Sequence, residues 1–258
     1  MVIKNKKIVL TGGSSGIGYQ LSKKLLAEGG TVAVLARRKE RLDKLSKEVQ
    51  GYEGKLYTYQ CDVTDRKRVY KVVSEINREM RGIDIAILNS GTGRPEGIKE
   101  FRAENAEAVF NTNVIGMVNC IEALIPIFLE QKSGVIAGVS SLADNRGYSR
   151  SGFYCGSKAA VSKILESLSA EMKSRGIRVV TIKPGFVRTE MTAGNNFKMP
   201  LLMEAEKAAV IIVKGLKKEK RIIQFPLGTV LGASIISLIP DRLFEYIEFK
   251  RLTKRINL

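Results

Sequence analysis

The chain has 258 residues, of which 43 are Lys or Arg and 26 are Asp or Glu, so its formal net charge is +17. It contains no histidine, which excludes His-based catalytic triads and His-ligated metal sites, and we expect no metal centre. No nucleic-acid-binding motif accompanies the basic residues, so we interpret them as solvated faces. The length is within the range of one large domain.

The cysteines and the N-terminal residues indicate in which cellular compartment the protein is expected. Cys61, Cys120 and Cys155 are odd in number and far apart, so they are expected to be reduced thiols. The first residues, Met1 to Lys7, lead directly into an apolar segment and leave no room for a signal peptide. These features predict a cytoplasmic protein.

Apolar segments typical of buried strands alternate along the chain with amphipathic segments typical of helices. The predicted strands are Ile8–Leu10, Thr31–Ala36, Lys55–Tyr59, Ile83–Leu88, Val135–Val139, Arg178–Ile182 and Ile222–Phe225. This alternation predicts an α/β protein with a doubly wound parallel sheet of about seven strands. No repeat or linker divides residues 1–225, which we interpret as one domain.

A glycine-rich turn follows the first predicted strand and precedes a predicted helix. Its sequence is Thr11-Gly12-Gly13-Ser14-Ser15-Gly16-Ile17-Gly18. Glycines let the backbone turn sharply and approach a pyrophosphate, whose charge is met by amide N–H groups and by the helix dipole. The spacing differs from the common G-x-G-x-x-G fingerprint of dinucleotide sites, and a purely structural turn is the alternative.

The second predicted strand ends in Ala36, Arg37 and Arg38. Proteins that bind NAD generally have an acidic side chain here for the ribose 2′-hydroxyl, whereas the 2′-phosphate of NADP requires a guanidinium. The two arginines therefore favour NADP(H). The alternative is the solvated start of a helix, since Lys39 and Arg41 continue the basic run.

A serine and a Tyr/Lys pair lie after the fifth predicted strand. Ser141 follows that strand, and Tyr154 and Lys158 are one helical turn apart in a predicted helix over residues 154–175. On one face of a helix, the Lys158 ammonium can lie beside the Tyr154 phenol and lower its pKa. Because ligands bind at the carboxyl ends of parallel strands, this position favours a proton-transfer site. The same Tyr/Lys spacing occurs twice more, at Tyr19/Lys23 and Tyr246/Lys250.

Taken in order, these motifs resemble those of the short-chain dehydrogenase/reductase family from about residue 7 to residue 192. The shared features are the Thr11-Gly12 turn, Asn89-Ser90-Gly91, Asn113 in N-V-I-G, Ser141, Tyr154 with Lys158, and Pro184-Gly185. The resemblance implies a single-domain Rossmann fold and NADP(H)-dependent interconversion of a carbonyl and an alcohol. One departure is Ser90, where family members usually have alanine.

The resemblance also implies roles for the four catalytic candidates. Tyr154 would be the general acid/base, and Lys158 would lower its pKa and hold the nicotinamide ribose. Ser141 would hydrogen-bond the substrate oxygen, and Asn113 would hold a water that relays protons to Lys158.

The residues expected to bind the cofactor come from the same motifs. They are Thr11, Gly12, Ser14, Ser15, Gly16, Ile17, Gly18, Arg37, Arg38, Asp62, Val63, Asn89, Ser90, Gly91, Tyr154, Lys158, Pro184, Gly185, Val187 and Thr189. By resemblance, Arg37 is favoured over Arg38 for the 2′-phosphate, and Thr189 would hold the nicotinamide carboxamide. Asp62 would contact the adenine or serve as a turn residue. Residues 190–202 have the composition of a mobile substrate loop.

Residues 226–258 form an apolar and basic extension that is atypical of the family, and we interpret it as packed on the same domain. Its first part, Pro226 to Pro240, has no charged residue and is too short to cross a bilayer. Gly228, Gly232 and the two prolines argue against a long regular helix. Peripheral membrane contact is the alternative, which we do not favour because acidic residues dilute the basic face.

We therefore predict an NADP(H)-dependent carbonyl reductase or alcohol dehydrogenase that acts on a small, apolar or lipid-like molecule and forms a homodimer or homotetramer. Reduction of 3-keto sphingoid bases at a membrane surface is a narrower alternative suggested by the resemblance. A non-catalytic NADP(H)-sensing regulator is the alternative from a different class, and the presence of both Tyr154 and Lys158 argues against it.

Overall fold

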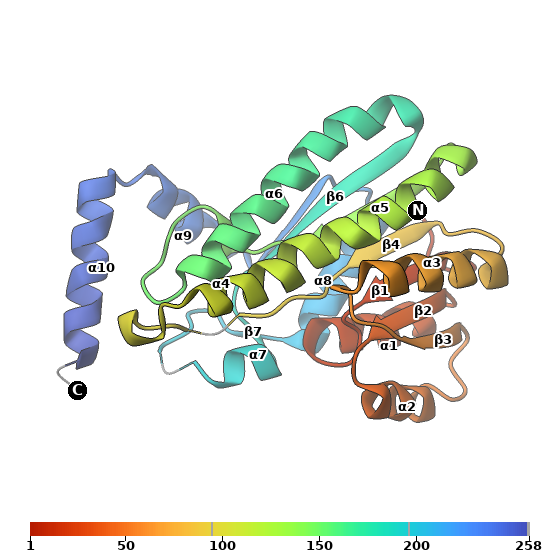
Figure 1. Cartoon of the computed structure of the whole chain (residues 1–258), viewed down its shortest axis with the longest axis horizontal. Helices are drawn as coiled ribbons and strands as arrows, with labels where there is room; N and C mark the ends of the chain where they lie inside the picture. The colour runs from red at the N-terminus through yellow and green to blue at the C-terminus, as the bar shows by residue number, and fades with distance from the viewer. Residues whose placement is uncertain (94, 196, 257–258) are drawn as a thin grey trace.

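The computed structural model describes residues 1–93, 95–195 and 197–256, with side chains through residue 253. In this part of the chain, seven strands form one parallel sheet in the order β3-β2-β1-β4-β5-β6-β9 (Figure 1). The strands are β1 (Lys7–Thr11), β2 (Thr31–Ala36), β3 (Lys55–Gln60), β4 (Ile85–Leu88), β5 (Gly134–Val139), β6 (Ile177–Pro184) and β9 (Ile222–Phe225). The predicted doubly wound sheet is confirmed, and each predicted strand is present with both ends within two residues of the prediction.

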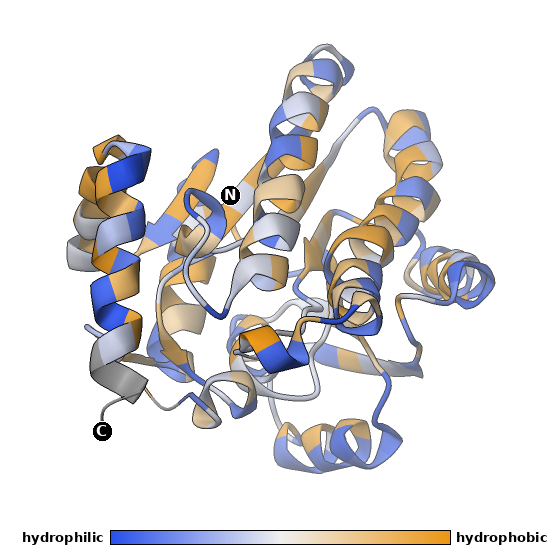
Figure 2. Cartoon of the chain, turned by 60° about the vertical axis from the view of Figure 1, so that its left-hand side comes forward, coloured by the Kyte–Doolittle hydropathy of each residue, from blue (hydrophilic) through white to orange (hydrophobic). Residues whose placement is uncertain are grey.

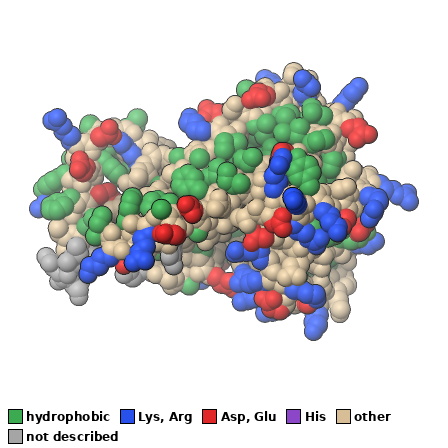
Figure 3. All heavy atoms as spheres, viewed as in Figure 1, with side chains coloured by type: hydrophobic (Ala, Val, Ile, Leu, Met, Phe, Trp, Pro, Cys, Tyr) green, Lys and Arg blue, Asp and Glu red, His purple; other side chains and the backbone are tan. Residues whose placement is uncertain are grey.

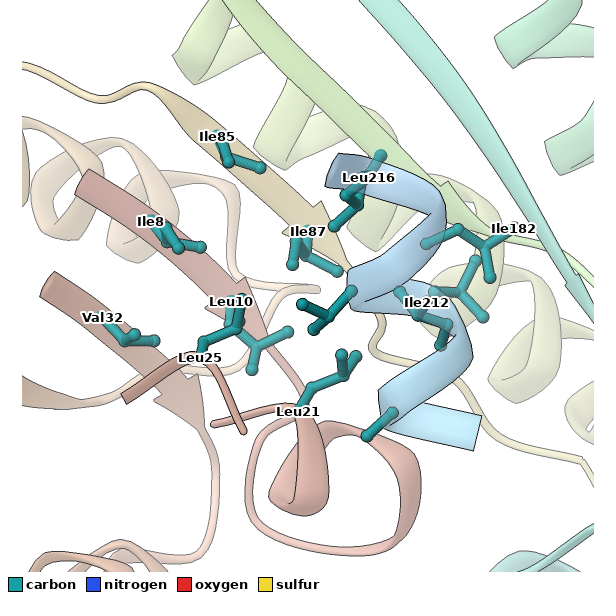
Figure 4. Close-up of a cluster of buried hydrophobic side chains, with 14 of the residues drawn as sticks. Ile8, Leu10, Leu21, Leu25, Val32, Ile85, Ile87, Ile182, Ile212 and Leu216 are labelled. Carbon is teal, nitrogen blue, oxygen red and sulfur yellow. The ribbon is translucent and has the colours of Figure 1, made fainter. Parts of the chain in front are cut away.

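Helices cover both faces of the sheet. On one face lie α1 (Gly16–Ala27), α2 (Lys39–Glu48) and α8 (Ala205–Lys217), and on the other lie α3 (Arg66–Met80), α5 (Gly116–Gln131) and α6 (Gly152–Met172). Successive strand residues point to opposite faces, so Ile8 and Leu10 enter the first core while Val9 enters the second. Figure 4 shows the first core, where side chains of β1, β2 and β4 meet those of α1 and α8. Burial on both faces explains why the strands are continuously apolar.

The helical segment over residues 103–131 is long and apolar. It consists of α4 (Ala103–Phe110), a π-helical turn η2 (Asn111–Ile115) and α5. Its length and composition would allow it to cross a membrane, but 56% of its most apolar window is buried inside the domain, as in a core helix. Hydrophobic side chains are also visible on the surface of this part of the molecule in Figure 3. Phe110, Ile115 and Val118 of the segment are exposed.

The chain after β6 forms a second, two-stranded parallel sheet that the sequence did not predict. β7 (Val187–Arg188) pairs with β8 (Met203–Glu204), and the short helix α7 (Glu190–Ala193) lies between them in sequence. Strands of two residues are too short to show a hydrophobic period. Short 3₁₀ turns complete the chain at η1 (Ile98–Glu100), η3 (Leu142–Asp144) and η4 (Lys173–Arg175).

The C-terminal extension contains two helices, α9 (Leu227–Leu238) and α10 (Asp241–Ile256). Glycines and prolines were expected to argue against a long regular helix, and residues 227–238 form a regular helix of 12 residues that ends before Pro240. Pro226 is the N-cap and Pro240 follows the last turn, so neither proline removes a hydrogen bond inside α9.

Both helices of the extension bond to the loop after β5. The Asn145 side chain donates to the carbonyl of Ala233 in α9 at 2.7 Å, and the backbone N–H of Ser149 donates to Glu248 in α10 at 2.9 Å. In Figure 2, apolar and charged residues are intermixed along α10. The side chains of Lys254 and Arg255 in the predicted basic tail lie outside the described part of the chain.

The variant Phe128→Ala tests how much the second core contributes to stability. Phe128 is fully buried, and a Cβ at Gly134 would lie 2.4 Å from its ring. We expect Phe128→Ala to lower the free energy of unfolding by about 3–5 kcal/mol, because it removes buried apolar surface and leaves a cavity. Urea unfolding followed by circular dichroism measures this. Phe249→Ala, at a 58% exposed position, is the matched control, with an expected change below about 0.5 kcal/mol. Equal losses in the two variants would contradict the prediction.

Candidate active site

The glycine-rich turn joins β1 to α1 at the carboxyl edge of the sheet and is tightly packed. Gly12 has φ +70°, and a Cβ there would lie 2.9 Å from the Ser90 Cα. A Cβ at Gly18 would lie 2.3 Å from the Gly12 carbonyl oxygen. Only glycine permits this approach, and the first amide N–H groups of α1 have no partner within the helix. The turn thus provides the backbone cradle that a pyrophosphate requires.

A polar groove of about 230 Å³ runs along this edge, where the strand order reverses between β1 and β4. The groove is lined by every predicted cofactor residue except Thr11 and Gly18. Thr11 and Gly18 do not line the groove but contact residues that do. The Thr11 hydroxyl accepts the backbone N–H groups of Asn89 at 3.0 Å and Ser90 at 3.1 Å, which ties the end of β4 to β1.

The two arginines at the end of β2 lie differently in the groove. The Arg37 side chain is 66% exposed, and its Nη1 lies 3.8 Å from Asp62 Oδ2. The Arg38 guanidinium instead turns toward the glycine-rich turn and donates from Nη2 to Ser15 Oγ at 2.9 Å and to Ser14 Oγ at 3.3 Å. Both can reach a phosphate on the adenosine ribose.

Asp62 is a turn residue that also lines the groove. Its Oδ1 accepts both the backbone N–H and the hydroxyl of Thr64, each at 2.9 Å. The alternative interpretation of Asp62 as a turn residue is therefore correct, and its position in the groove wall leaves the adenine contact as a prediction.

Ser141, Tyr154 and Lys158 come together at the inner end of the groove. Ser141 follows β5 as the N-cap of η3, and its hydroxyl accepts the Ala143 N–H at 3.1 Å. Tyr154 lies in the first turn of α6, and its phenol is close enough to Ser141 for the serine to lower its pKa. Lys158, 4% exposed, lies one turn later with its Nζ 5.8 Å from the centre of the Tyr154 ring. That Nζ donates to the Val139 carbonyl at 2.9 Å.

Burial dominates the protonation of this pair. It raises the pKa of the Tyr154 phenol, and the hydrogen bond with Ser141 only partly opposes this. Burial also lowers the pKa of Lys158 to about 8. The expectation that Lys158 lowers the pKa of Tyr154 was wrong for this structure, because burial raises this pKa and the group that opposes the rise is Ser141. The ammonium of Lys158 is instead bonded to the Val139 carbonyl.

Asn113 lies in the π-helical turn η2 and is 1% exposed. Its Oδ1 accepts the Thr92 N–H at 2.7 Å, and its Nδ2 donates to the Thr92 carbonyl and to Ser157 Oγ, both at 2.9 Å. A Cβ at Gly91 would lie 3.3 Å from Asn113 Oδ1 and 3.4 Å from Lys158 Nζ. Asn113 therefore fixes residues 91 and 92 beside Lys158, and a relay water there stays a prediction.

A polar network beneath Lys158 was missed in the sequence. Ser140 Oγ donates to the Lys158 carbonyl at 2.9 Å, and Ser162 donates to both Ser140, at 2.8 Å, and Asp144. Asp144 also pairs with Lys183 at 2.7 Å. The network joins α6 to the ends of β5 and β6. A signal was available, since Ser162 follows Lys158 by one helical turn and Ser140 precedes Ser141.

A larger cavity of about 460 Å³ adjoins the groove, and Ser141 and Tyr154 line both. Most of its wall is apolar or small. The apolar residues include Leu142, Phe186, Met191, Phe197, Leu201 and Ile236, and α9 adds Gly228, Gly232 and Ala233. Among the described lining residues, Arg251 of α10 is the one charged side chain. A substrate in this cavity would meet the Ser141 and Tyr154 hydroxyls at the boundary with the groove.

These residues fit a nicotinamide dinucleotide. The glycine cradle would hold the pyrophosphate, the arginines and Asp62 line the adenosine end, and Tyr154 and Lys158 lie at the other end beside the cavity.

Comparison with known proteins agrees with a site for a nicotinamide cofactor. The sequence model described as short chain dehydrogenase matches residues 6–200. An uncharacterized oxidoreductase from Myxococcus xanthus is 33% identical over 237 residues, which cover 92% of this chain and 94% of the relative. The 3-oxoacyl-[acyl-carrier-protein] reductase FabG from Thermotoga maritima is 34% identical over 192 residues, or 74% of this chain and 78% of that protein.

Solved structures share the fold. A short chain dehydrogenase from Burkholderia cenocepacia in complex with NADP has a TM-score of 0.81 at 23% identity, covering 94% of this chain and 96% of that one. A short chain dehydrogenase/reductase from Burkholderia phymatum in complex with NAD has a TM-score of 0.82 at 18% identity, covering 91% and 93%. With its fold, its site and these relatives, the chain belongs to the short-chain dehydrogenase/reductase family of nicotinamide-cofactor-binding oxidoreductases.

Proposed function

We propose that the protein is an NADP(H)-dependent oxidoreductase that interconverts a carbonyl and an alcohol on an apolar substrate. The observation that carries the proposal is that Ser141 and Tyr154 lie in the shared wall of a dinucleotide-sized polar groove and an apolar cavity. A carbonyl oxygen at this boundary would be within reach of two hydroxyls, with its carbon directed toward the groove.

The preference for NADP(H) rests on Arg37 and Arg38. No acidic side chain follows β2 directly, and two guanidinium groups line the groove at the position where the ribose 2′-substituent is bound in Rossmann folds. Guanidinium groups bind phosphate with paired, charge-assisted hydrogen bonds.

The bound nicotinamide would supply or accept the hydride at the carbonyl carbon. Ser141 donates a hydrogen bond to the substrate oxygen, which directs the carbonyl toward Tyr154. The phenol of Tyr154, kept protonated at neutral pH by its raised pKa, gives its proton to that oxygen as the alcohol forms. Lys158 has three N–H donors, of which the Val139 carbonyl takes one, and the others can hold ribose hydroxyls.

The cavity supports an apolar carbonyl compound as the substrate. Its wall of aliphatic and aromatic side chains stabilises an apolar chain by excluding water. A relative named as a 3-oxoacyl reductase also favours a carbonyl next to an acyl chain. A screen of aldehydes, ketones and 3-keto lipids, followed by NADPH oxidation, tests the proposal. Turnover of none of these classes would contradict it.

Tyr154→Phe tests the proton donor. We expect turnover to fall by about 10²- to 10⁴-fold, because only the hydroxyl is deleted. NADPH affinity, measured by fluorescence titration, should change less than about twofold, since the ring remains in place. The matched control is Tyr246→Phe on α10, where Lys250 lies over the Tyr246 ring at 5.5 Å in the same spacing. Near-native turnover of Tyr154→Phe would overturn the role of Tyr154.

Lys158→Met tests the buried ammonium. The pKa of Lys158 is lowered from 10.5 to about 8, so between these values the unfolded chain binds more protons than the folded protein, and this group makes stability rise with pH. We expect Lys158→Met to raise the free energy of unfolding at pH 7 by about 1–3 kcal/mol, since a buried charge is removed.

Urea unfolding of both proteins between pH 7 and pH 10 measures this effect. The difference between the two proteins isolates Lys158 from tyrosines and cysteines that titrate in the same range. The advantage of the variant should shrink above about pH 8. An advantage that did not change with pH would show that Lys158 is not a buried cation.

Arg37→Ala tests the cofactor preference. We expect NADPH affinity to fall by about 10- to 150-fold and NADH affinity to stay nearly unchanged, because only NADPH has the 2′-phosphate. Arg38→Ala should act in the same direction. Lys39→Ala is the matched control, because Lys39 pairs with Asp43 on the exposed face of α2. Titration with both nucleotides decides the matter, and equal losses for NADPH and NADH would mean that Arg37 does not bind the phosphate.

A further inference from the structure

Glu190 lies across the cofactor groove from Arg38 and Arg41 and pairs with both. It is the first residue of α7 and directly follows Thr189. Its Oε2 accepts from Arg38 Nη1 at 2.9 Å, and its Oε1 lies 3.1 Å from Arg41 Nη2. The two arginines belong to the start of α2, far from Glu190 in the sequence. Composition of the loop gave no sign of this contact.

The same guanidinium of Arg38 also donates to the hydroxyls of Ser14 and Ser15 in the glycine-rich turn. Arg38 is therefore shared between the turn that would hold the pyrophosphate and a carboxylate from α7. A 2′-phosphate on the adenosine ribose would use the same N–H donors, because carboxylate and phosphate both bind guanidinium with paired oxygens. Glu190 accepts from Arg38 Nη1 on the edge of the guanidinium, so a phosphate that bound the same edge would meet the carboxylate.

We propose that Glu190 determines cofactor specificity by competing with the 2′-phosphate of NADP(H) for Arg38 and Arg41, so that NADP(H) binds by displacing this carboxylate. The inference rests on the NADP(H) part of the proposed function. NAD(H), which has a hydroxyl at this position, binds without breaking the pairs.

The charge and exposure of these groups would let a 2′-phosphate replace the Glu190 carboxylate at the arginines. The neighbouring Arg38, which hydrogen-bonds the carboxylate, helps to lower the pKa of Glu190, so it is ionised at neutral pH. The side chains of Glu190, Arg38 and Arg41 are each roughly half exposed, and exposed ion pairs contribute little to stability. A phosphate with greater charge can therefore take the place of the carboxylate.

Glu190 is directly followed by residues that line the substrate cavity. The next two residues of α7, Met191 and Thr192, line both the cofactor groove and the apolar cavity. The Thr192 hydroxyl donates to the Val187 carbonyl at 2.8 Å, which holds α7 against β7. Glu190 is therefore in the same short helix as two residues that line the substrate cavity.

The test uses binding rather than turnover. Adenosine 2′,5′-bisphosphate carries the 2′-phosphate without the nicotinamide, and adenosine 5′-monophosphate lacks it. Isothermal titration measures the affinity of both for the wild-type protein and for Glu190→Gln, which keeps the shape of the side chain and removes its charge. We expect the variant to bind the bisphosphate about three- to tenfold more tightly and the monophosphate with unchanged affinity.

Glu204→Gln is the matched control. Glu204 in β8 pairs with Arg188 at 2.8 Å on the same side of the molecule and does not line the groove, so its removal should leave both affinities unchanged. Weaker binding of the bisphosphate by Glu190→Gln would overturn the inference, because it would mean that Glu190 orients Arg38 for the phosphate. Equal changes for the two nucleotides, or an effect as large in Glu204→Gln, would overturn it as well.

The same titrations separate this inference from the proposed function. If the wild-type protein prefers the bisphosphate and Glu190→Gln does not alter that preference, the NADP(H) proposal holds and the role of Glu190 is wrong. If neither protein prefers the bisphosphate, both are wrong. A preference that emerges only in Glu190→Gln would support the competition directly.

Discussion

The packing of residues 89–93 between the glycine-rich turn and α6 is the constraint on which the rest of the site depends. Added Cβ atoms would meet Ser90 from Gly12, Lys158 from Gly91, and the Tyr154 ring, at 2.5 Å, from Gly93. This short segment therefore touches the expected pyrophosphate site at one end and the catalytic pair at the other. It fixes the spacing between the glycine-rich turn and the Tyr154/Lys158 pair, and close packing leaves little room for added volume at Gly93.

Most of the fold and the groove could be predicted because their signals are local. A parallel sheet buried on both faces needs continuous apolar strands, and a close backbone approach needs glycine at fixed positions such as Gly12 and Gly18. Three predicted site residues, Thr11, Gly18 and Asn113, support the groove rather than line it. Their motif identified the site, but only the structure shows that they act through neighbours.

The features that sequence analysis missed depend on partners distant in the chain. Glu190 meets Arg38 only because the ends of β2 and β7 lie at one edge of the fold, and no spacing rule links them. The β7–β8 pair is two residues long on each side. The expected lowering of the Tyr154 pKa was wrong for a related reason. A one-turn spacing brings Lys158 close to Tyr154 in sequence terms, whereas the burial that raises the pKa of Tyr154 and lowers that of Lys158 is a property of the folded chain.

The apolar cavity is lined by two parts of the chain, the region that the family model matches and the C-terminal extension. The family match ends at residue 200 and includes Ser141, Tyr154 and Lys158. Beyond it, Gly228 and Gly232 of α9 line the apolar cavity, and a Cβ at Gly232 would meet nothing within 4 Å. The two glycines weaken α9 as an isolated helix, yet they leave room in the cavity that larger residues would fill. The extension thus forms one wall of the cavity, while Ser141 and Tyr154 reach the same cavity from the matched region. Under the proposed function, changes in α9 would alter the space for the substrate without altering Tyr154.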